Sequence, residues 1–483
     1  MGGGRYDVAI VGAGVVGCSV ARELARYRLK VVVLEKESDV AEGASGANSG
    51  VLHSGFKEPK MSKKALYCVE GNRRFREEIA EELEVPFKPI GTYTVGETEK
   101  DREKLEKLLE AGTAAGAEGL RIIEEDELKK AEPHVRGKVA LLAPTGAIID
   151  PHEYVIALAE NAAVNGVDFD FNTEVADVEE REGGYVVKTA CGDYHAKYVV
   201  NSAGVYADKL AAMVGYNKHK VNPCRGEYFI LDKKVGGLIR GMIYPMPPEK
   251  TGGIGVHLTP TIAGNILIGP SAEYIACKDD VASTAGRMKE LYEGAVALVP
   301  EIEYKDIIHE YSGLRSKIIE PGSANKGDFV VEDEPEGFIQ LLGIESPGLT
   351  AAPVLAEKVR EIIQGHEKLE ENPDFNPRRK ARARFSELSK EEKRKLIRED
   401  PDYGVIVCRC EEVTKREIRD ALENPLGVRT LKGLRIRTRA GMGRCQGGFC
   451  LPRILQIIDE IYGQGVEATL KGAESRICDV RMR

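Results

Sequence analysis

The sequence predicts a mixed α/β fold in three parts: a domain built on a parallel sheet, a lobe of antiparallel strands, and a small helical C-terminal domain. Three observations lead to this prediction. The chain opens with a β–α–β pattern, residues 220–320 contain β-rich segments separated by Pro and Gly turns, and four cysteines in two close pairs follow residue 403. With 483 residues, 42% of them hydrophobic, the chain is long enough for two or three domains.

The N-terminal residues predict the first β–α–β unit. Residues 6–12 (YDVAIVG) form an apolar strand, a helix follows through about Tyr27, and a second buried strand runs from Lys30 to Glu35. Because two parallel strands need a crossover helix between them, we expect a parallel sheet to begin here.

A glycine loop, Gly12-Ala-Gly14-Val-Val-Gly17, connects the first strand to its helix. The first glycine permits the tight turn, the second lets the backbone approach a pyrophosphate, and the third lets the helix pack closely on the strand. The helix N-terminus stabilises phosphate charge, and Glu35 can accept hydrogen bonds from ribose hydroxyls. We therefore predict a Rossmann-like dinucleotide site, although the loop does not distinguish FAD from NAD.

The middle of the chain alternates between amphipathic and apolar segments. The predicted elements, in order, are helices over about 58–83, 98–117 and 152–165, strands over 168–200, a buried strand at 198–204, antiparallel strands within 220–320, and a strand, turn and helix over 338–363.

The C-terminal region predicts a linker followed by a third domain. Residues 371–402 are highly charged and include RRKARAR, which favours a solvated linker with helical pieces; docking of an acidic partner is the alternative. Residues 403–483 then form the third domain. It should contain a helix at 415–423 with a capping box, Thr414 with Glu417, and a helix at 451–462 that ends at Gly463.

Composition excludes several classes of protein. The net charge of −9 and pI near 5.7 argue against nucleic-acid binding. No apolar run approaches the roughly 18 residues of a transmembrane helix, and the N-terminus lacks a signal-peptide pattern, so we expect a cytoplasmic protein. The 30% charged content with no Trp is typical of a thermophile.

The cysteine pairs Cys408/Cys410 and Cys445/Cys450 predict a metal centre. Thiolates are soft donors for iron, and four of them suffice for a 2Fe–2S cluster. We expect Cys408 and Cys410 to share one iron, with Gly447 and Gly448 letting amides approach the sulfurs. Structural zinc is the main alternative, but its cysteine pairs usually enclose two to four residues. The other six cysteines are scattered, mostly in apolar contexts, and should be free core thiols.

Three further segments resemble the flavin-contacting segments of the D-amino-acid-oxidase superfamily. They are GASGANSGVLHSG at 43–55, NSAG at 201–204 and GIESPGLT at 343–350. The resemblance implies FAD, with the amides of a helix starting at Gly348 stabilising the anionic reduced ring. The implied cofactor-binding residues are Gly12, Ala13, Gly14, Val15, Val16, Gly17, Glu35, Lys36, Ala44, Ser45, Asn48, Ser49, Val51, Val175, Ala203, Gly204, Gly343, Ile344, Pro347, Gly348, Leu349 and Thr350.

Almost the whole chain has a closer resemblance. Residues 1–370 resemble the branch of FAD-dependent glycerol-3-phosphate and L-2-hydroxyglutarate dehydrogenases through NSGVLHSG, PCRGEYFILD, IYPMPP, GVHLTPT and GIESPGLT. The C-terminal part resembles the 2Fe–2S domain of the bacterioferritin-associated-ferredoxin type, and RTRAGMGRCQGGFC resembles the A subunits of anaerobic glycerol-3-phosphate dehydrogenases. We expect FAD-binding parts at 1–57, 140–215 and 325–370, and a substrate lobe at 58–139 and 216–324.

The resemblance also assigns the chemistry. Alcohol oxidation needs a base for the hydroxyl proton and an acceptor for the hydride. The resemblance implies that His53 is the base beside the flavin ring and that His257 faces the ligand. Arg315 in YSGLRSK would contact an anionic substrate through its planar fork. Tyr244 and Lys250 are further substrate-binding candidates. We expect Arg225, by contrast, to support the sheet.

The leading prediction is oxidation of sn-glycerol 3-phosphate to dihydroxyacetone phosphate, with electrons passing from FAD through a 2Fe–2S cluster to a partner subunit in a hetero-oligomer. That partner could bring the protein to the membrane periphery. One alternative is an L-2-hydroxyglutarate or other 2-hydroxyacid dehydrogenase, and another is an amino-acid-oxidising subunit of the proline or hydroxyproline kind. A non-catalytic electron-transfer subunit is a further alternative, against which the candidate catalytic residues argue.

Overall fold

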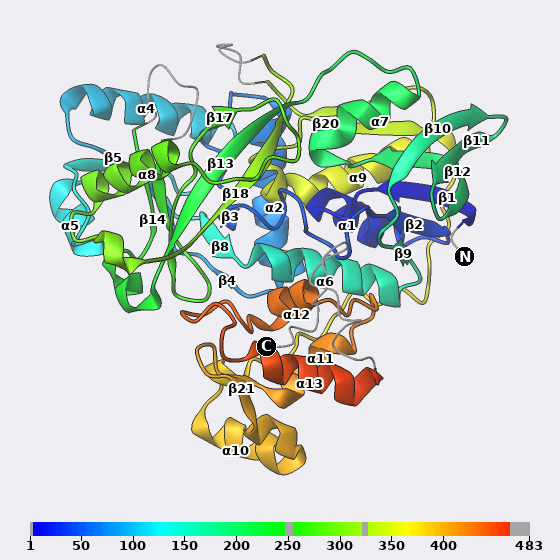
Figure 1. Cartoon of the computed structure of the whole chain (residues 1–483). Coiled ribbons are helices and arrows are strands. Elements are labelled where there is room, and N and C mark those ends of the chain that lie inside the picture. Colours follow the sequence, from blue (N-terminus) through cyan, green and yellow to red (C-terminus); the bar gives the residue numbers. More distant parts are fainter. Residues whose placement is uncertain (1–2, 247–254, 321–326, 464–483) are drawn as a thin grey trace.

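The computed structural model describes residues 3–246, 255–320 and 327–463. The three predicted parts are distinct in Figure 1: the N-terminal domain with the blue strands, a lobe beside it, and the orange-to-red third domain beneath helix α6 (Pro151–Val164). The predicted fold class is confirmed. No helix within these residues combines the length and apolar character that crossing a bilayer requires.

The first sheet has eight strands and a parallel centre. Its strands are β1 Gly4–Val11, β2 Val31–Leu34, β9 Asp168–Asp170, β10 Val175–Arg181, β11 Gly184–Thr189, β12 Gly192–Asn201, β19 Val330–Asp333 and β20 Phe338–Leu342. β1 pairs in parallel with β2 and β12, β2 with β9, and β12 with β20. β11 pairs antiparallel with β10 and β12, and β19 pairs antiparallel with β20.

Helices cover both faces of this sheet, as mostly parallel sheets require. Along β1, Val8 and Ile10 pack in one core with α1 (Val15–Leu24), α6 and α9 (Gly348–His366), while Ala9 and Val11 pack in a second core. Helix α7 (Ala207–Met213) contributes Leu210 to that second core. The alternation of side chains along the strand therefore produces two apolar layers.

Residues 58–85 differ from expectation, because they belong to the first domain and not to the substrate lobe. Helix α2 (Lys63–Arg74), the π-helical turn η1 (Phe75–Ile79) and α3 (Ala80–Glu82) pack on the core of the first domain. The contact with α9 is close: a Cβ added at Gly71 would lie 2.0 Å from the carbonyl oxygen of Thr350. Only a glycine permits this approach of two helices.

The lobe is built on a nine-stranded sheet, with α8 (Ala285–Leu298) contributing Met288 and Leu291 to its core. The sheet contains β5 Thr92–Gly96, β6 Arg121–Glu124, β7 Val139–Ala143, β13 Asn222–Leu231, β14 Met242–Pro245, β15 His257–Pro260, β16 Ile266–Gly269, β17 Glu273–Tyr274 and β18 Ile307–Lys317. The expectation of an antiparallel sheet was right except for one pair, since β14 runs parallel to β5. Helix α8 was not expected.

Several short elements complete the first domain and the lobe. They are β3 Val51–Leu52, β4 Phe87–Lys88 and β8 Ala147–Ile149, which form a three-stranded sheet, helices α4 Glu99–Ala114 and α5 Glu125–Ala131, and the 3-10 turns η2 Gly204–Tyr206, η3 Lys233–Leu238 and η4 Tyr304–Asp306.

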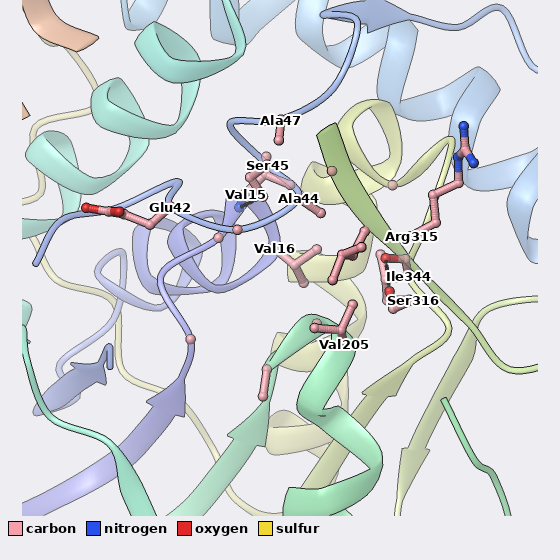
Figure 2. Close-up of a pocket in the computed structure, with 18 of the residues that line it drawn as sticks. Val15, Val16, Glu42, Ala44, Ser45, Ala47, Val205, Arg315, Ser316 and Ile344 are labelled. Carbon is pink, nitrogen blue, oxygen red and sulfur yellow. Dashed lines mark hydrogen bonds between the residues drawn. The ribbon is translucent and has the colours of Figure 1, made fainter. Parts of the chain in front are cut away.

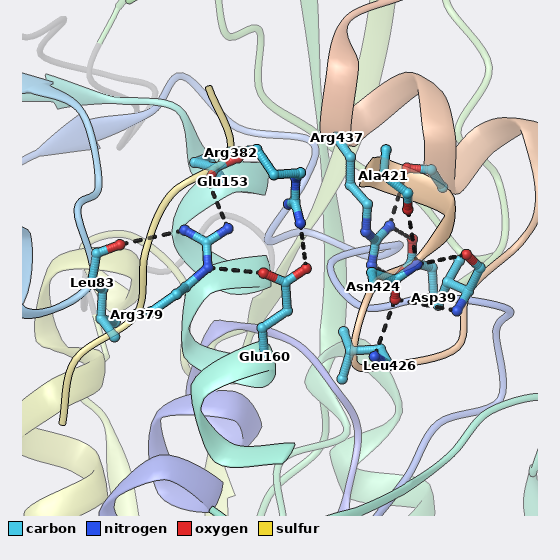
Figure 3. A network of polar contacts seen from close by, with 12 residues as sticks. Asp39, Leu83, Glu153, Glu160, Arg379, Arg382, Ala421, Asn424, Leu426 and Arg437 are labelled. Atoms are coloured by element: carbon cyan, nitrogen blue, oxygen red, sulfur yellow. Dashed lines mark hydrogen bonds and ion pairs between the residues drawn. The ribbon is translucent and has the colours of Figure 1, made fainter. Parts of the chain in front are cut away.

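Part of the charged segment 371–402, around Arg379, is docked on α6 rather than solvated (Figure 3), whereas the same segment also contains a helix, α10 (Lys390–Glu399), without buried residues. The Arg379 side chain is buried, donating to Glu160 Oε2 from Nε at 2.8 Å and to Glu153 Oε1 from Nη2 at 2.9 Å. Arg382 donates to the other oxygen of Glu160 at 2.7 Å. The basic run RRKARAR therefore binds carboxylates of this same chain.

The third domain consists of short elements around its own core. These are β21 Ile406–Cys408, β22 Val413–Thr414, α11 Lys415–Leu422, α12 Leu431–Thr438 and α13 Leu451–Tyr462, and they are preceded by η5 Phe385–Glu387, α10 and η6 Pro401–Gly404. The capping box of Thr414 with Glu417 is present, and α13 ends at Gly463 in the left-handed conformation, as predicted. Helix α12, which packs near α6, was not predicted.

Candidate active site

One cavity of about 660 Å³ runs continuously from the glycine loop to the strands of the lobe. This volume is typical of a small-molecule or cofactor site. Figure 2 shows that Glu42 and Arg315 lie at opposite ends of the drawn cavity, with Val16, Ala44 and Ser45 between them. The cavity is lined by these predicted cofactor residues: Gly12, Gly14, Val15, Val16, Glu35, Lys36, Ala44, Ser45, Asn48, Ser49, Val51, Val175, Ala203, Gly204, Ile344, Pro347, Gly348 and Leu349.

Four predicted cofactor residues do not line the cavity. Ala13 donates its amide to Glu35 Oε2 at 2.7 Å, and a Cβ on Gly17 would lie 2.0 Å from the Gly12 carbonyl oxygen. Gly343 has a φ of +69°, and Thr350 Oγ1 accepts the backbone N–H of His53 at 3.0 Å. These four residues therefore support the wall of the cavity without lining it.

The glycine loop has the geometry that a dinucleotide requires. Gly12 has a φ of +103°, and an added Cβ would lie 2.7 Å from the Ser202 carbonyl oxygen. At the start of α1, the amide of Val15 donates to Ser45 Oγ at 2.9 Å. Burial raises the pKa of Glu35, which also accepts the Glu37 amide at 2.9 Å. Glycine cradle, helix N-terminus and acidic residue together fit the phosphates and ribose of FAD.

His53 lies beside this cavity in a form suited to accept a proton. Burial, and next the charge of Lys57, lower its pKa to about 4. Its Nε2 lies 3.3 Å from Ser346 Oγ, within hydrogen-bond range. Because the imidazole is neutral at physiological pH, one ring nitrogen can act as a base.

His257 and Tyr244 occupy neighbouring strands of the lobe, β15 and β14. His257 lines the cavity, and its Nε2 is buried without a hydrogen-bond partner among the described residues. Such an atom fits contact with a bound ligand. Tyr244 is buried behind His257 and does not line the cavity, so the structure does not bring it to a ligand directly. Lys250 lies outside the described residues.

Arg315 enters the cavity from β18, as expected of a cation for an anionic substrate. Its Nη2 donates to the Ser271 carbonyl oxygen at 3.1 Å, and its Nη1 lies 3.6 Å from Cys224 Sγ. These contacts orient the guanidinium. Arg225, in contrast, is buried among carboxylates, pairing at 2.9 Å with both Glu273 and Asp280. It supports the lobe, as expected.

Two charged groups near the site were not predicted. Lys57 Nζ lies 3.5 Å from the centroid of the Tyr244 ring, and its charge lowers the pKa of both His53 and His257. Nothing in the sequence distinguishes this lysine from its exposed neighbours. Glu345 lines the cavity and accepts from Lys64 and Lys317, each at 2.9 Å. Its place within GIESPGLT was the available signal.

Tyr228 is a third residue that the sequence analysis missed. It lines the cavity and stacks on Tyr311, with centroids 4.7 Å apart and ring planes within 6°. Tyr311 in turn donates its hydroxyl to the Asn48 carbonyl oxygen at 2.9 Å. The segment PCRGEYFILD contains Tyr228, so the resemblance already pointed to this strand.

The four predicted metal-ligating thiols form two pairs across the two segments. Cys410 Sγ donates to Cys445 Sγ at 3.5 Å, near the roughly 3.8 Å tetrahedral edge that metal–sulfur bonds of about 2.3 Å produce. Burial, and then the nearby Cys408 thiol, raise the pKa of Cys450 to about 12. Cys408 and Cys410 thus each lie near a cysteine of the second segment, and the expectation that these two share one iron stays a prediction.

The loops around these thiols fit a 2Fe–2S cluster. A Cβ added at Gly443 would lie 2.3 Å from Cys410 Cβ. The Cys410 thiol, and then the amides of Phe449 and Gly447, lower the pKa of Cys445, so amides approach this sulfur as expected. In residues 3–246, 255–320 and 327–463, no three His, Cys, Asp or Glu side chains are arranged around one metal ion. Two thiol pairs match two irons better than one zinc.

The remaining cysteines divide into two groups. Cys18, Cys68 and Cys224 are buried thiols, as expected, whereas Cys191 and Cys277 are exposed. Cys478 lies outside the described residues.

Two protein-family models match the chain. One, described as FAD dependent oxidoreductase, matches residues 7–362, and the other, described as BFD-like [2Fe-2S] binding domain, matches residues 406–460. The first covers the cavity with both candidate histidines and Arg315. The second covers the four thiols.

Individual proteins that are similar to this chain belong to the same kinds of enzyme. The chain is 41% identical to a glycerol 3-phosphate dehydrogenase of Caloramator mitchellensis over 95% of each sequence. It is 32% identical to a mitochondrial L-2-hydroxyglutarate dehydrogenase of Arabidopsis thaliana, over 74% of this chain and 83% of that protein. Among solved structures, the dithionite-reduced L-alpha-glycerophosphate oxidase of Mycoplasma pneumoniae with FAD bound is similar, with a TM-score of 0.73 and 29% identity over 79% of this chain and all of that one.

Proposed function

The chain belongs to the FAD-dependent oxidoreductase family, and from this membership we propose that it oxidises sn-glycerol 3-phosphate to dihydroxyacetone phosphate. The observation that carries the proposal is the 41% identity to a glycerol 3-phosphate dehydrogenase, which extends over 95% of both chains and so includes the 2Fe–2S domain. Structural similarity to a glycerophosphate oxidase supports the same substrate.

His53 supplies the base that this reaction needs. Oxidation of the secondary alcohol removes the hydroxyl proton and a hydride from the same carbon, leaving a C=O bond. FAD, held by the glycine loop and the segments around Ser45 and Gly348, would supply the hydride acceptor. His53, neutral because its pKa is about 4, takes the proton on a ring nitrogen, and the Ser346 hydroxyl 3.3 Å from Nε2 orients the imidazole.

Arg315 supplies the charge that holds the phosphate. Its guanidinium lines the cavity on the lobe side, and its contacts with Ser271 and Cys224 fix its direction. A planar fork binds a phosphate through two parallel hydrogen bonds, which orients the substrate for hydride transfer. His257, whose Nε2 has no partner among the residues that the structure describes, offers a polar contact in the same cavity.

L-2-hydroxyglutarate is the second candidate substrate. Several relatives with 27–33% identity are named L-2-hydroxyglutarate dehydrogenase, and the Arg315 guanidinium can bind a carboxylate as well as a phosphate. The test is anaerobic bleaching of the flavin absorbance with each compound. We expect glycerol 3-phosphate to bleach the flavin within seconds at millimolar concentration. Bleaching by L-2-hydroxyglutarate alone would replace our substrate, and bleaching by neither would remove both.

We further infer that electrons leave through the third domain to a partner subunit. Cys410 and Cys445 are exposed, so a cluster bound there would be accessible to an external acceptor. Beside them Phe449 is 52% exposed, with the Arg409 guanidinium 4.8 Å from its ring centroid. An exposed aromatic with a cation is typical of a protein-binding surface. We expect any membrane association to come from that subunit.

A further inference from the structure

The third domain reaches into the cofactor cavity of the first. Lys432, on α12, lines the cavity and forms an ion pair with Glu42, which lines it too. Every cofactor residue expected from the sequence lies before residue 351, in the first domain. The cavity wall beside the glycine loop therefore includes a side chain from the iron–sulfur domain.

A buried ion pair holds α12 in this position. Arg437 Nη2 donates to Asp39 Oδ1 at 2.9 Å, its Nη1 donates to Asp39 Oδ2, and both side chains are fully buried (Figure 3). Gly433 lies against the same carboxylate, since a Cβ there would be 2.9 Å from Asp39 Oδ2. Because a buried charge without its partner is strongly unfavourable, this contact fixes how the third domain docks.

Asp39 and Glu42 belong to a loop that lies against the glycine loop at this end of the cavity. In this loop the Ala41 amide donates to the Ala13 carbonyl oxygen at 3.1 Å, and Ser45 Oγ accepts the first amide of α1. Figure 2 places Glu42 at the end of the cavity away from Arg315. Lys432 thus lies on the side of the cavity that the glycine loop lines, together with the carboxyl groups of Glu35 and Glu42.

We propose that the third domain forms one wall of the FAD site, with Lys432 as a binding residue for the pyrophosphate. A dinucleotide brings two negative charges to a wall that carries carboxylates, and a lysine ammonium offsets them. Since FAD then contacts both domains, FAD binding and domain docking stabilise each other by the same factor. Loss of FAD therefore weakens the docking of α12 on the first domain, and removal of the Lys432 charge lowers the affinity for FAD.

The first experiment measures the dissociation constant of FAD by flavin fluorescence on the full chain after removal and titration of FAD. Lys432→Gln should raise the dissociation constant of FAD about tenfold, and Lys432→Arg should bind FAD with near wild-type affinity. The matched control is Lys415→Gln, because Lys415 is also a third-domain lysine that pairs with a glutamate, Glu460, but at 2.7 Å within its own domain. Unchanged affinity in Lys432→Gln, or an equal loss in the control, would overturn the proposal.

A double variant separates the two possible partners of Lys432. If the lysine acts only by neutralising Glu42, then Glu42→Gln/Lys432→Gln should restore FAD affinity. If it acts on the phosphates, the double variant should stay at least several-fold weaker than wild type, which is our expectation. Restored affinity would contradict the proposal.

The second experiment tests the reverse direction of the coupling by hydrogen exchange. Amides of α12 should exchange several-fold faster in the FAD-free protein than in the holoprotein, while amides of α11 in the same domain should not change. Iron content, measured in parallel, shows that the third domain stays folded. Equal exchange of α12 with and without FAD would show that the domain docks independently of the cofactor.

Discussion

The rings of Tyr244 and His257 are stacked, with centroids 4.2 Å apart and planes inclined by only 15°. The two residues lie opposite each other on β14 and β15, whose register pairs Ile243 with Leu258. The phenol ring therefore sets the plane of the imidazole, whose Nε2 has no hydrogen-bond partner in the described part of the chain. Tyr244 was predicted to bind substrate, and its stacking on His257 leads us to expect that it acts by positioning that imidazole.

Replacing Tyr244 tests this positioning role. Tyr244→Leu removes the ring, and because such aromatic pairs contribute about 0.5–1.5 kcal/mol, we expect KM for substrate to rise by up to about tenfold with unchanged FAD content. Tyr244→Phe keeps the ring and should stay near wild type. Steady-state kinetics with both variants distinguishes the roles, since a large loss in Tyr244→Phe would restore a direct part for the hydroxyl.

His53→Asn should slow chemistry without releasing the cofactor. Loss of a general base costs typically 10²–10⁴-fold, so the rate of anaerobic flavin reduction should fall by about that factor. The matched control is His195→Asn, at an exposed position of β12. Stopped-flow absorbance gives the rate, and the ratio of flavin to protein absorbance gives retention. If FAD is lost in proportion to the rate, His53 is structural.

The pH dependence of flavin reduction provides a test of the environment of His53. Its pKa is about 4 in the folded protein against an ordinary value near 6.5, so the free enzyme keeps its base form down to about pH 4. We expect the limiting rate of flavin reduction at saturating substrate, which does not report the ionisation of the free substrate phosphate at about pH 6, to lack an acid limb near pH 6.5. Between these two values the unfolded chain binds more protons, so His53 lowers stability as pH falls from 6.5 towards 4. Anaerobic rates from pH 4.5 to 8, with circular dichroism as a folding control, give the answer; a limb near 6.5 would contradict the buried environment.

The sequence was sufficient where structure is set locally. The glycine loop, Glu35 and the capping box of Thr414 all depend on neighbours within one or two elements, so their spacing alone predicted them. The histidines and Arg315 were found through resemblance, and the cavity brings all three together.

Features that depend on distant segments were missed for the same physical reason. The charged run around Arg379 looks solvated because its partners, Glu153 and Glu160, lie more than 200 residues earlier. Lys432 carries no motif, and only docking of the third domain brings it to the cavity. The approach of the Cys410 thiol to Cys445, 35 residues later, was not predicted, because it depends on how the two segments fold together.

Cys445→Ser should separate the two redox centres. Because Cys445 pairs with Cys410, its removal takes away one of two thiols on that side, and iron per chain should fall well below half of wild type. Flavin reduction by substrate should persist, while reduction of an external protein acceptor fails. Cys277→Ser, an exposed cysteine of the lobe, is the control. Colorimetric iron analysis measures the iron content of both variants. A wild-type iron content in Cys445→Ser would show that Cys445 is not an iron ligand.

Arg379→Met tests whether the docked basic segment stabilises the fold. The Arg379 side chain is 6% exposed and faces two carboxylates that are 7% and 5% exposed, so its loss leaves uncompensated buried charge. We expect a destabilisation of about 3–5 kcal/mol in denaturant unfolding.

The pH dependence of this difference follows from Glu153. Burial raises the pKa of Glu153, but the charge of Arg379 and its neighbours keeps that pKa below its ordinary value. The stabilisation by Arg379 is therefore present at pH 7 and is lost as pH falls. The deficit of the variant should therefore shrink towards pH 4. Arg378→Met is the matched control, because that neighbouring side chain is 76% exposed and lies 3.7 Å from Glu81, and its change should stay within about 0.5 kcal/mol. Equal stability of the two variants would mean that the segment rests on α6 without stabilising it.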